Sequence, residues 1–272
     1  MSPYTLPPCN VQIQFSGGRT SAFMLHQILE ANGGLPDRAH VCFQNTGREM
    51  PETLDFVNEC GERWGVSIVW LEYRPDDPRF AIVNHNSASR DGEPFEMLIR
   101  KRQFLPNRVA RFCTAELKVH CASRYARHAL GWDEWKSAVG IRADEARRIP
   151  KKPQKERWQP WHPLYHAGAT KAEITAFWDA QSFDLRLSNI NGRTPLGNCD
   201  GCFLKSEANR AALAREHPER FEWWVRMEQI ARGTFRPAEP YSDLAKFVNT
   251  QGDWLFDETN YLCQADDGEC TG

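Results

Sequence analysis

The sequence predicts an α/β fold built around a parallel β-sheet. Three short apolar runs, residues 11–15, 39–45 and 66–71, alternate with two segments that carry apolar residues at helical spacing. This strand-helix-strand-helix-strand order, with short connections, is typical of a parallel sheet that helices cover on both faces. A chain of 272 residues is long enough for one large α/β domain, or for a domain with a substantial appendage.

A glycine-rich loop follows the first strand. Ser16, Gly17 and Gly18 form a predicted turn, and Thr20 and Ser21 begin the predicted helix. Glycines allow positive φ angles and let a ligand approach bare backbone N–H groups, while a helix N-terminus attracts anions. The loop is therefore a candidate phosphate site, with the three hydroxyl groups as further donors. The alternative is a strand-to-helix turn that uses glycine for structural reasons alone.

The second strand also ends in candidate binding residues. Asn45 closes the apolar run, and Thr46 and Gly47 follow it. Right-handed crossovers place the ends of the first two strands side by side, and ligands of open α/β sheets bind at the carboxyl ends of strands. We therefore expect Asn45, Thr46 and Gly47 to lie beside the glycine-rich loop.

The later elements are mostly helices. Residues 114–130 and 170–178 have helical spacing, with Thr114 and Thr170 as the predicted N-caps. Helical spacing is also clear over residues 207–230. Apart from a short helix, the stretch after the third strand shows little periodicity, and neither does the C-terminal tail.

A fourth predicted strand, residues 135–141, leads into a candidate phosphate-binding arginine. The strand ends in Gly140-Ile141-Arg142. A guanidinium fork placed at a strand end can hold a phosphate group. The alternative is an ordinary surface arginine, but at this end of the sheet we favour Gly140 and Arg142 as nucleotide-binding residues.

Composition indicates a globular protein without a strong charge bias. Hydrophobic residues make up 41% of the chain, charged residues 26%, and the net charge is −2. Basic clusters at residues 100–111 and 147–155 are local, and a solvated surface is the commoner reason for such runs. No apolar run approaches the roughly 20 residues of a membrane span, and the N-terminus lacks the pattern of a signal peptide. We therefore expect a cytoplasmic protein that does not enter the membrane.

The nine cysteines are many for a cytoplasmic protein, and their odd number argues against a full disulfide framework. Cys42 and Cys60 lie in apolar patterns and are predicted core thiols. Cys121 lies on a predicted helix and is expected to be structural. Cys9 precedes the first strand and carries no clear signal.

The remaining cysteines form a candidate metal site. Cys199 and Cys202 are spaced as Cys-x-x-Cys, which lets two thiolates converge on one metal centre from a tight turn. Cys113 precedes a predicted helix, and Cys270 or Cys263 could complete the set. An iron–sulfur cluster is the first interpretation, zinc the second, a redox dithiol the third, and unrelated thiols in a turn the last.

Five segments together resemble the PAPS reductase-like family, in the form common in phages and mobile elements. This family belongs to the adenine-nucleotide alpha-hydrolase superfamily, whose loop reads Ser-Gly-Gly-x-x-Ser. The segments are residues 16–21, 45–53, 111–118, 140–148 and 198–205. The resemblance implies a Rossmann-like parallel sheet of five strands in the order 3-2-1-4-5. It also implies a nucleotide-binding domain over residues 1–188 and a helical, cysteine-bearing region over residues 189–272.

The resemblance further implies an adenine nucleotide, either ATP or an adenylyl sulfate (PAPS or APS), together with Mg²⁺ and a 4Fe-4S cluster. The residues expected to bind the nucleotide are Ser16, Gly17, Gly18, Arg19, Thr20, Ser21, Asn45, Thr46, Gly47, Gly140 and Arg142. The expected metal ligands are Cys113, Cys199, Cys202 and Cys270, with Cys263 as the alternative. Arg19, Arg142 and Cys270 are the expected catalytic residues.

The chain departs from the family pattern at three places. The APS reductase cluster uses adjacent cysteines, whereas here Phe112 precedes Cys113. Thioredoxin-dependent PAPS reductases end in Glu-Cys-Gly-x-His, whereas this tail, residues 268–272, has Glu269 and Cys270 but no histidine. The usual aspartate of ATP-using thiolation enzymes is replaced by Thr20 or Arg19. The extra arginine would favour a more anionic nucleotide or contact a second phosphate.

Three functions therefore stay open at the level of sequence. The first is ATP-dependent sulfur transfer to a nucleic acid or related acceptor, with a sulfur-donor protein as a further partner. The second is reduction of an adenylyl sulfate by a thiolate. The third is a nucleotide-binding module without catalysis, and any of the three could act as an oligomer.

Overall fold

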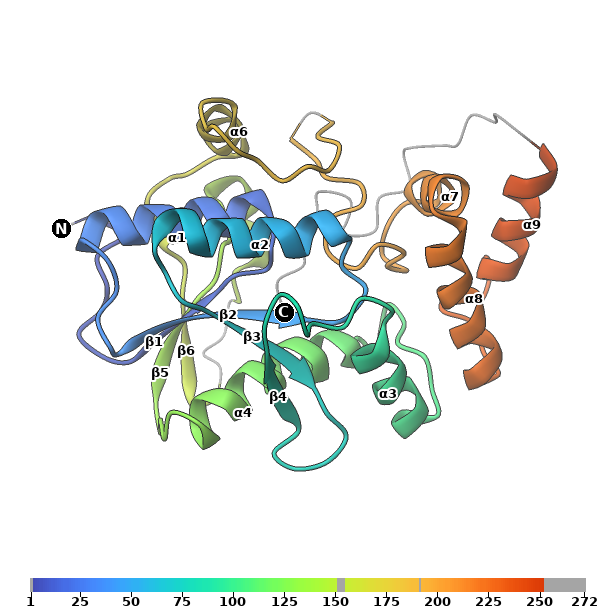
Figure 1. Cartoon of the computed structure of the whole chain (residues 1–272), viewed down its shortest axis with the longest axis horizontal. Helices are drawn as coiled ribbons and strands as arrows, with labels where there is room; N and C mark the ends of the chain where they lie inside the picture. The colour runs from blue at the N-terminus through green and yellow to red at the C-terminus, as the bar shows by residue number, and fades with distance from the viewer. Residues whose placement is uncertain (1, 151–154, 191, 252–272) are drawn as a thin grey trace.

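The computed structural model describes residues 2–150, 155–190 and 192–251. Within these residues six strands form one mixed sheet in the order β4-β3-β2-β1-β5-β6 (Figure 1). Strand β4 is antiparallel to β3, and every other neighbouring pair is parallel. The strands are β1 Val11–Gln14, β2 Ala39–Asn45, β3 Ile68–Tyr73, β4 Phe80–Val83, β5 Trp135–Ala138 and β6 Trp158–Trp161.

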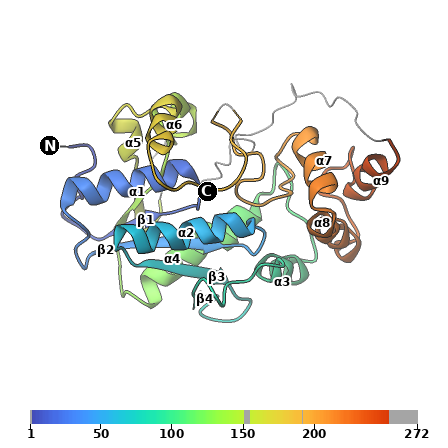
Figure 2. The same ribbon diagram turned by 45° about the horizontal axis from the view of Figure 1, so that its top comes forward.

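Helices cover both faces of the sheet. Helices α1, α2 and α6 lie on one face, and α4 lies on the other (Figures 1 and 2). The helices are α1 Arg19–Asn32, α2 Pro51–Trp64, α3 Glu93–Arg102, α4 His120–His128, α5 Pro163–His166, α6 Lys171–Asp179, α7 Glu207–Glu216, α8 Pro218–Ala231 and α9 Tyr241–Gln251, with the π-helix η1 Thr114–Val119 and the 3₁₀ helix η2 Ala143–Arg148. Buried side chains of β1, α1, α2 and α6 share one apolar cluster on their face, and a smaller cluster of Cys42, Leu71, Cys121 and Tyr125 lies under α4, so both sheet faces are buried.

The parallel part of the sheet confirms the expected topology. Without β4, the order β3-β2-β1-β5-β6 is the predicted 3-2-1-4-5 arrangement. The prediction of five strands is wrong by one, because β4 folds back on β3 as an antiparallel edge strand. Helix α1 ends at Asn32, where Gly33 takes a left-handed conformation with φ 64°.

The helix starts test the predicted caps. The Thr170 hydroxyl accepts a hydrogen bond from the Glu173 backbone N–H at 3.4 Å, so this N-cap is confirmed. The prediction that Thr114 caps a helix is wrong. Cys113 is the N-cap there, it already has helical angles (φ −60°, ψ −46°), and Thr114 lies inside the π-helix.

The C-terminal helices build a second apolar cluster. Residues of α7, α8 and α9 pack together and against α3, with Trp224 and Phe221 fully buried at the centre. The predicted helical stretch 207–230 is two helices, because Pro218 begins α8 after a break at His217. In Figure 1 these helices lie beside the end of the sheet from which the β1 and β2 loops emerge.

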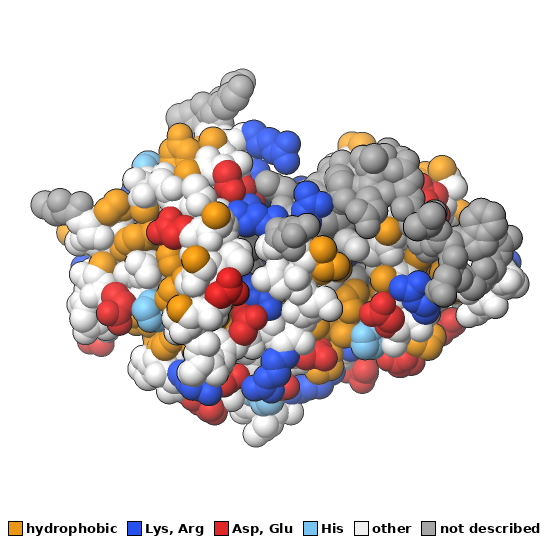
Figure 3. Space-filling view, turned by 90° about the horizontal axis from the view of Figure 1, so that it is seen from above, with side chains coloured by type: hydrophobic (Ala, Val, Ile, Leu, Met, Phe, Trp, Pro, Cys, Tyr) orange, Lys and Arg blue, Asp and Glu red, His pale blue; other side chains and the backbone are white. Residues whose placement is uncertain are grey.

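The surface in Figure 3 carries interspersed acidic and basic side chains, in keeping with the net charge of −2. Within the described ranges, no helix is both long and apolar enough to cross a membrane.

Candidate nucleotide and thiol site

The loop after β1 is a tight, internally bonded turn. Gly17 has φ 81°, and a Cβ at this position would lie 2.6 Å from the Thr53 methyl carbon. Only glycine fits there without strain. The hydroxyls of Ser16 and Ser21 are 2.9 Å apart, and Ser21 also donates to the Gly18 carbonyl at 2.9 Å. These two serines therefore hold the shape of the loop.

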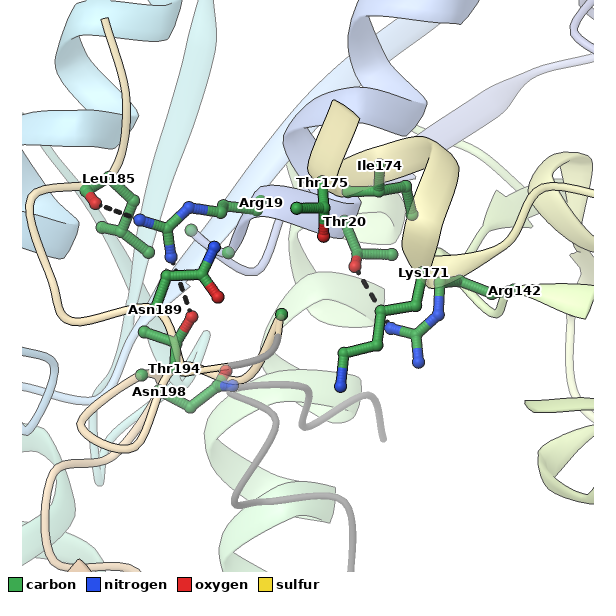
Figure 4. A pocket seen from close by; sticks show the side chains of 14 residues that line it. Arg19, Thr20, Arg142, Lys171, Ile174, Thr175, Leu185, Asn189, Thr194 and Asn198 are labelled. Carbon is green, nitrogen blue, oxygen red and sulfur yellow. Dashed lines mark hydrogen bonds between the residues drawn. The ribbon is translucent and has the colours of Figure 1, made fainter. Parts of the chain in front are cut away.

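A pocket of about 450 Å³ opens over this loop and the start of α1 (Figure 4). Five of the predicted residues line it: Gly17, Gly18, Arg19, Thr20 and Arg142. Five polar residues outside the predicted set also line the pocket: Lys171, Thr175, Asn189, Thr194 and Asn198.

Arg142 connects the end of β5 to the glycine-rich loop. Its Nε donates to Asp144 at 2.8 Å, and one terminal nitrogen, Nη1, lies 3.4 Å from the Thr20 hydroxyl. The side chain is buried, so its direction is fixed. Figure 4 shows Arg142 and Lys171 extending into the pocket from one side, with Asn198 on the opposite side. The two cations are therefore placed to meet an anionic ligand above the loop.

Arg19 is held by hydrogen bonds within the protein. Its guanidinium makes five hydrogen bonds to described residues of the segment 184–194. Two go to the Asp184 carboxylate at 2.7 and 2.6 Å, one to the Thr194 hydroxyl at 3.0 Å, and two to the carbonyls of Leu185 and Leu187. Arg19 therefore ties this segment to the first turn of α1, and Figure 4 shows its side chain directed toward Leu185 and Thr194.

The other predicted nucleotide-binding residues do not line this pocket. Gly140 packs against the first turn of α1, where its Cβ position would be 3.6 Å from the Ser21 Cα. The Asn45 side chain is buried and donates to Glu72 at 2.7 Å. Thr46 lines a second pocket, and the backbone N–H of Gly47 donates to the Asn45 side chain at 3.1 Å.

The second pocket, of about 400 Å³, is lined by three of the predicted metal ligands: Cys113, Cys199 and Cys202. The remaining lining is mostly apolar, with Phe95, Leu117, Phe203, Leu204 and Trp224, while Thr46, Thr114 and Lys118 add polar groups. The structure thus brings together thiols that are up to 89 positions apart, since 202 − 113 = 89. We call this space the thiol pocket.

Cys199 is fixed against the loop that follows β2. Its Sγ lies 3.4 Å from the Thr46 hydroxyl, and Cys199 pairs with Glu49 in an antiparallel bridge. Burial raises the pKa of the Cys199 thiol well above its usual range, and the nearby Glu49 carboxylate acts in the same direction. Lys118, which also lines the pocket, lowers this pKa but does not offset burial, so the bare thiol is a weak nucleophile at neutral pH and further positive charge would be needed to hold it as a thiolate.

Among the described residues, no group of three or more His, Cys, Asp or Glu side chains is arranged to hold a single metal ion. Three thiols spread around one pocket fit a larger group, because an iron–sulfur cluster takes one thiolate at each of several iron atoms. The predicted ligands Cys263 and Cys270 lie outside the described residues.

Consecutive residues line the two pockets. Asn198 lines the pocket over the glycine-rich loop, and the next residue, Cys199, lines the thiol pocket. Consecutive Cα atoms are about 3.8 Å apart. Asn198 has φ 54°, a left-handed conformation that turns the chain from one pocket to the other.

Comparison with known protein families identifies the domain family of the chain. The phosphoadenosine phosphosulfate reductase domain family matches residues 10–168, which is more than half of the chain. The chain belongs to this family. The matched part of the PAPS reductase domain includes the glycine-rich loop, Arg142 and Cys113, but ends before Cys199 and Cys202.

The individual protein that matches the chain has a low sequence identity to it. The chain is 29% identical over 203 residues to the uncharacterized nin region protein ORF290 of Escherichia phage lambda, a match that covers 71% of this chain and 66% of that protein. The chain therefore spans just under two thirds of the length of this relative. The similarity agrees with the expected phage form of the PAPS reductase domain.

Two solved structures are similar at low identity. One is a phosphoadenylyl-sulfate reductase from Candida auris in a phosphate complex, with TM-score 0.43 and 17% identity over 66% of this chain and 79% of that one. The other is the U34-tRNA thiolase NcsA from Methanococcus maripaludis with its [4Fe-4S] cluster, with TM-score 0.39 and 13% identity over 90% of this chain and 74% of that one. Likenesses at this level carry no conclusion about activity.

Proposed function

We propose that this chain is an adenine-nucleotide-binding enzyme that transfers sulfur, and that its reaction is ATP-dependent thiolation of a nucleic acid or related acceptor. The observation that carries the proposal is that the consecutive residues Asn198 and Cys199 line two pockets, the one over the glycine-rich loop, here called the phosphate pocket, and the thiol pocket. Sulfur transfer needs an activated phosphate ester and a sulfur source within reach of each other. The lining of both pockets by neighbouring residues supports such an arrangement.

The phosphate pocket would hold the nucleotide. Backbone N–H groups of Gly17 and Gly18 and the start of α1 would receive the phosphates, as helix N-termini do. An acceptor oxygen would attack the α-phosphate, forming an adenylated acceptor and releasing pyrophosphate. Arg142 and Lys171 would stabilise the charge that grows on the phosphate oxygens, and Mg²⁺ would neutralise the pyrophosphate.

The thiol pocket would hold an iron–sulfur cluster through Cys113, Cys199 and Cys202, with Cys270 or Cys263 as the fourth ligand. A cluster held by these three cysteines alone would leave one iron without a protein ligand, a position that could accept sulfur, whereas a fourth cysteine would close that position. Sulfide-level sulfur from a donor protein would then displace AMP from the adenylated acceptor, leaving the acceptor thiolated. The apolar lining would limit access of water, which would otherwise hydrolyse the activated acceptor.

A second candidate function is reduction of an adenylyl sulfate, and the name of the matched family favours it. A thiolate would attack the sulfonate sulfur and displace the adenosine phosphate, and a second thiol would release sulfite and leave a disulfide. Cys270 is the proposed nucleophile. Cys199 suits this role poorly, because burial raises its pKa.

We also propose the division into a nucleotide-binding domain, residues 1–188, and a helical region, residues 189–272. The separate apolar cluster of α7, α8 and α9 supports this division, although α3 contributes to the same cluster. In this view the helical region brings Cys199 and Cys202 to the nucleotide-binding domain.

Product analysis separates the candidate functions. The protein, purified without oxygen, is incubated with ATP and a nucleic-acid acceptor, and in parallel with PAPS and APS. Pyrophosphate release that depends on the acceptor supports thiolation, and sulfite release supports reduction. Nucleotide binding with neither product, across a range of acceptors and reductants, would favour the binding module. The variant Arg142→Ala serves as the control for background hydrolysis.

A further inference from the structure

A buried carboxylate anchors the turn of residues 199–202. Asp200 is completely buried and accepts four hydrogen bonds from described residues. Arg48 Nη2 and Arg220 Nε each donate to one of its oxygens at 2.6 Å. The indole N–H of Trp224 at 2.8 Å and the backbone N–H of the following residue at 2.7 Å donate to the other. The turn that carries two cysteines is thus held by its own central side chain.

The two arginines come from different parts of the fold. Arg48 belongs to the loop after β2, and its carbonyl accepts the Asp200 backbone N–H at 2.8 Å. Arg220 lies on α8, and its Nη2 donates to the Glu49 carbonyl at 2.8 Å. Arg48 Nη2 also donates to the Arg220 carbonyl at 2.8 Å, and its guanidinium stacks on Trp223 at 4.9 Å. The network therefore joins the 199–202 turn, the β2 loop and α8.

The loop after β2 also contacts the Cys199 thiol directly. The Glu49 carboxylate is buried and accepts hydrogen bonds from the backbone N–H and the hydroxyl of Thr46 at 2.8 to 2.9 Å. The Thr46 hydroxyl lies 3.4 Å from Cys199 Sγ. Any shift of the β2 loop relative to the turn would therefore move the surroundings of this sulfur.

Stability alone is a weak explanation for this arrangement. Buried charges cost several kcal/mol each to desolvate, and apolar residues of similar volume often stabilise a fold as well or better. Arg48 Nε is buried without a hydrogen-bond partner among the described residues, which adds to that cost. A charged network at this position is better explained by a requirement for fixed geometry and fixed charge beside the thiols.

We propose that Asp200 is a positioning residue of the thiol pocket: through Arg48 and Arg220 it fixes the two thiols of the 199–202 turn and sets the charge that a bound cluster experiences. This inference rests on the proposed cluster. Replacing the carboxylate by an amide removes a negative charge near the thiols, which favours the reduced state of a bound cluster. It also leaves the two arginines without their shared counter-charge, which loosens the turn.

The test compares Asp200→Asn with Glu239→Gln in the full-length chain, purified without oxygen. Glu239 pairs with the fully buried Arg210 and with Arg236, both of the helical region, rather than with the 199–202 turn or Arg48. Iron and sulfide content, the midpoint potential and the rate of iron loss to a chelator are measured. We expect Asp200→Asn to have a higher potential and to lose iron at least tenfold faster, with Glu239→Gln close to wild type.

A second variant keeps the test informative if Asp200→Asn does not fold. Arg220→Lys retains the positive charge but loses the bidentate reach to Asp200 and Glu49, so we expect faster iron loss with little change in potential. Wild-type potential and chelation rate in both variants, despite a lower free energy of unfolding, would show that Asp200 only stabilises the fold. A wild-type protein without iron would instead refute the proposed cluster itself.

Discussion

Arg19 offers the sharpest distinction between a structural and a catalytic role. Replacing it with methionine keeps the aliphatic stem but removes five hydrogen bonds to the segment 184–194. Because the Asp184 side chain is 41% exposed, water can replace Arg19 as its hydrogen-bond partner. The Arg19–Asp184 pair therefore contributes less than about 1 kcal/mol to the free energy of unfolding. The carbonyls of Leu185 and Leu187 belong to buried residues, and each unsatisfied acceptor costs about 1–3 kcal/mol. We expect Arg19→Met to lower the free energy of unfolding by about 3 kcal/mol.

Urea unfolding followed by tryptophan fluorescence measures this loss. The signal comes from the ten tryptophans of the chain, and among them Trp178 donates its indole N–H to the Arg19 carbonyl at 2.9 Å. Calorimetric titration with ATP is run on the same samples. We expect weaker nucleotide binding as well, because Asn189, Thr194 and Asn198 lie on or beside the segment that Arg19 holds.

Asp184→Asn is the matched control, with an expected loss below about 1 kcal/mol because the Asp184 side chain is itself open to water. If Arg19→Met unfolds at the wild-type free energy while ATP affinity falls, Arg19 contacts the nucleotide directly. That result would refute the structural role and restore the catalytic role expected from the sequence.

Three further predictions concern single positions. Arg142→Ala should weaken ATP binding by at least about tenfold, with Arg142→Lys intermediate because it keeps the charge but not the fork; equal affinities in calorimetry would count against the phosphate site. Gly17→Ala should cost about 2 kcal/mol or more in urea unfolding, because φ is 81° and the new Cβ meets Thr53 at 2.6 Å; unchanged stability would contradict the loop geometry. Burial raises the pKa of Cys42 to about 12, so about one molecule in ten thousand carries its thiolate at pH 8. Mass spectrometry after alkylation should find exposed Cys9 modified and Cys42 protected until the chain unfolds.

The parallel core was predictable because its signals are local. Buried runs such as residues 39–45, punctuated by glycines, determine strand, turn and helix in sequence order. Strand β4 gave no such signal, since its four residues lie at an edge and Ile82 is 59% exposed. Helix α9 lies in a tail without clear periodicity, and the break before α8 depends on a single proline.

The candidate site likewise contains residues that the sequence predicted and residues that it did not. Gly17, Gly18 and Thr20 were found because the loop and its helix are contiguous in sequence. Thr194 was missed, since it lies in a turn-rich linker 175 positions from the arginine that binds it. Such residues reach the pocket only through tertiary packing. The separate environment of Thr46 could not be inferred either, because it depends on where the 199–202 turn docks.

Iron and acid-labile sulfide analysis, with the visible absorption spectrum, tests most directly the claim that the thiol pocket beside the phosphate loop holds a cluster. Wild-type protein purified without oxygen should contain about four iron and four sulfide per chain and absorb broadly in the visible range. Cys199→Ser should lose most of both, with nucleotide binding retained. A wild-type protein that is colourless and free of iron, or a Cys199→Ser variant that keeps the full spectrum, would contradict the account.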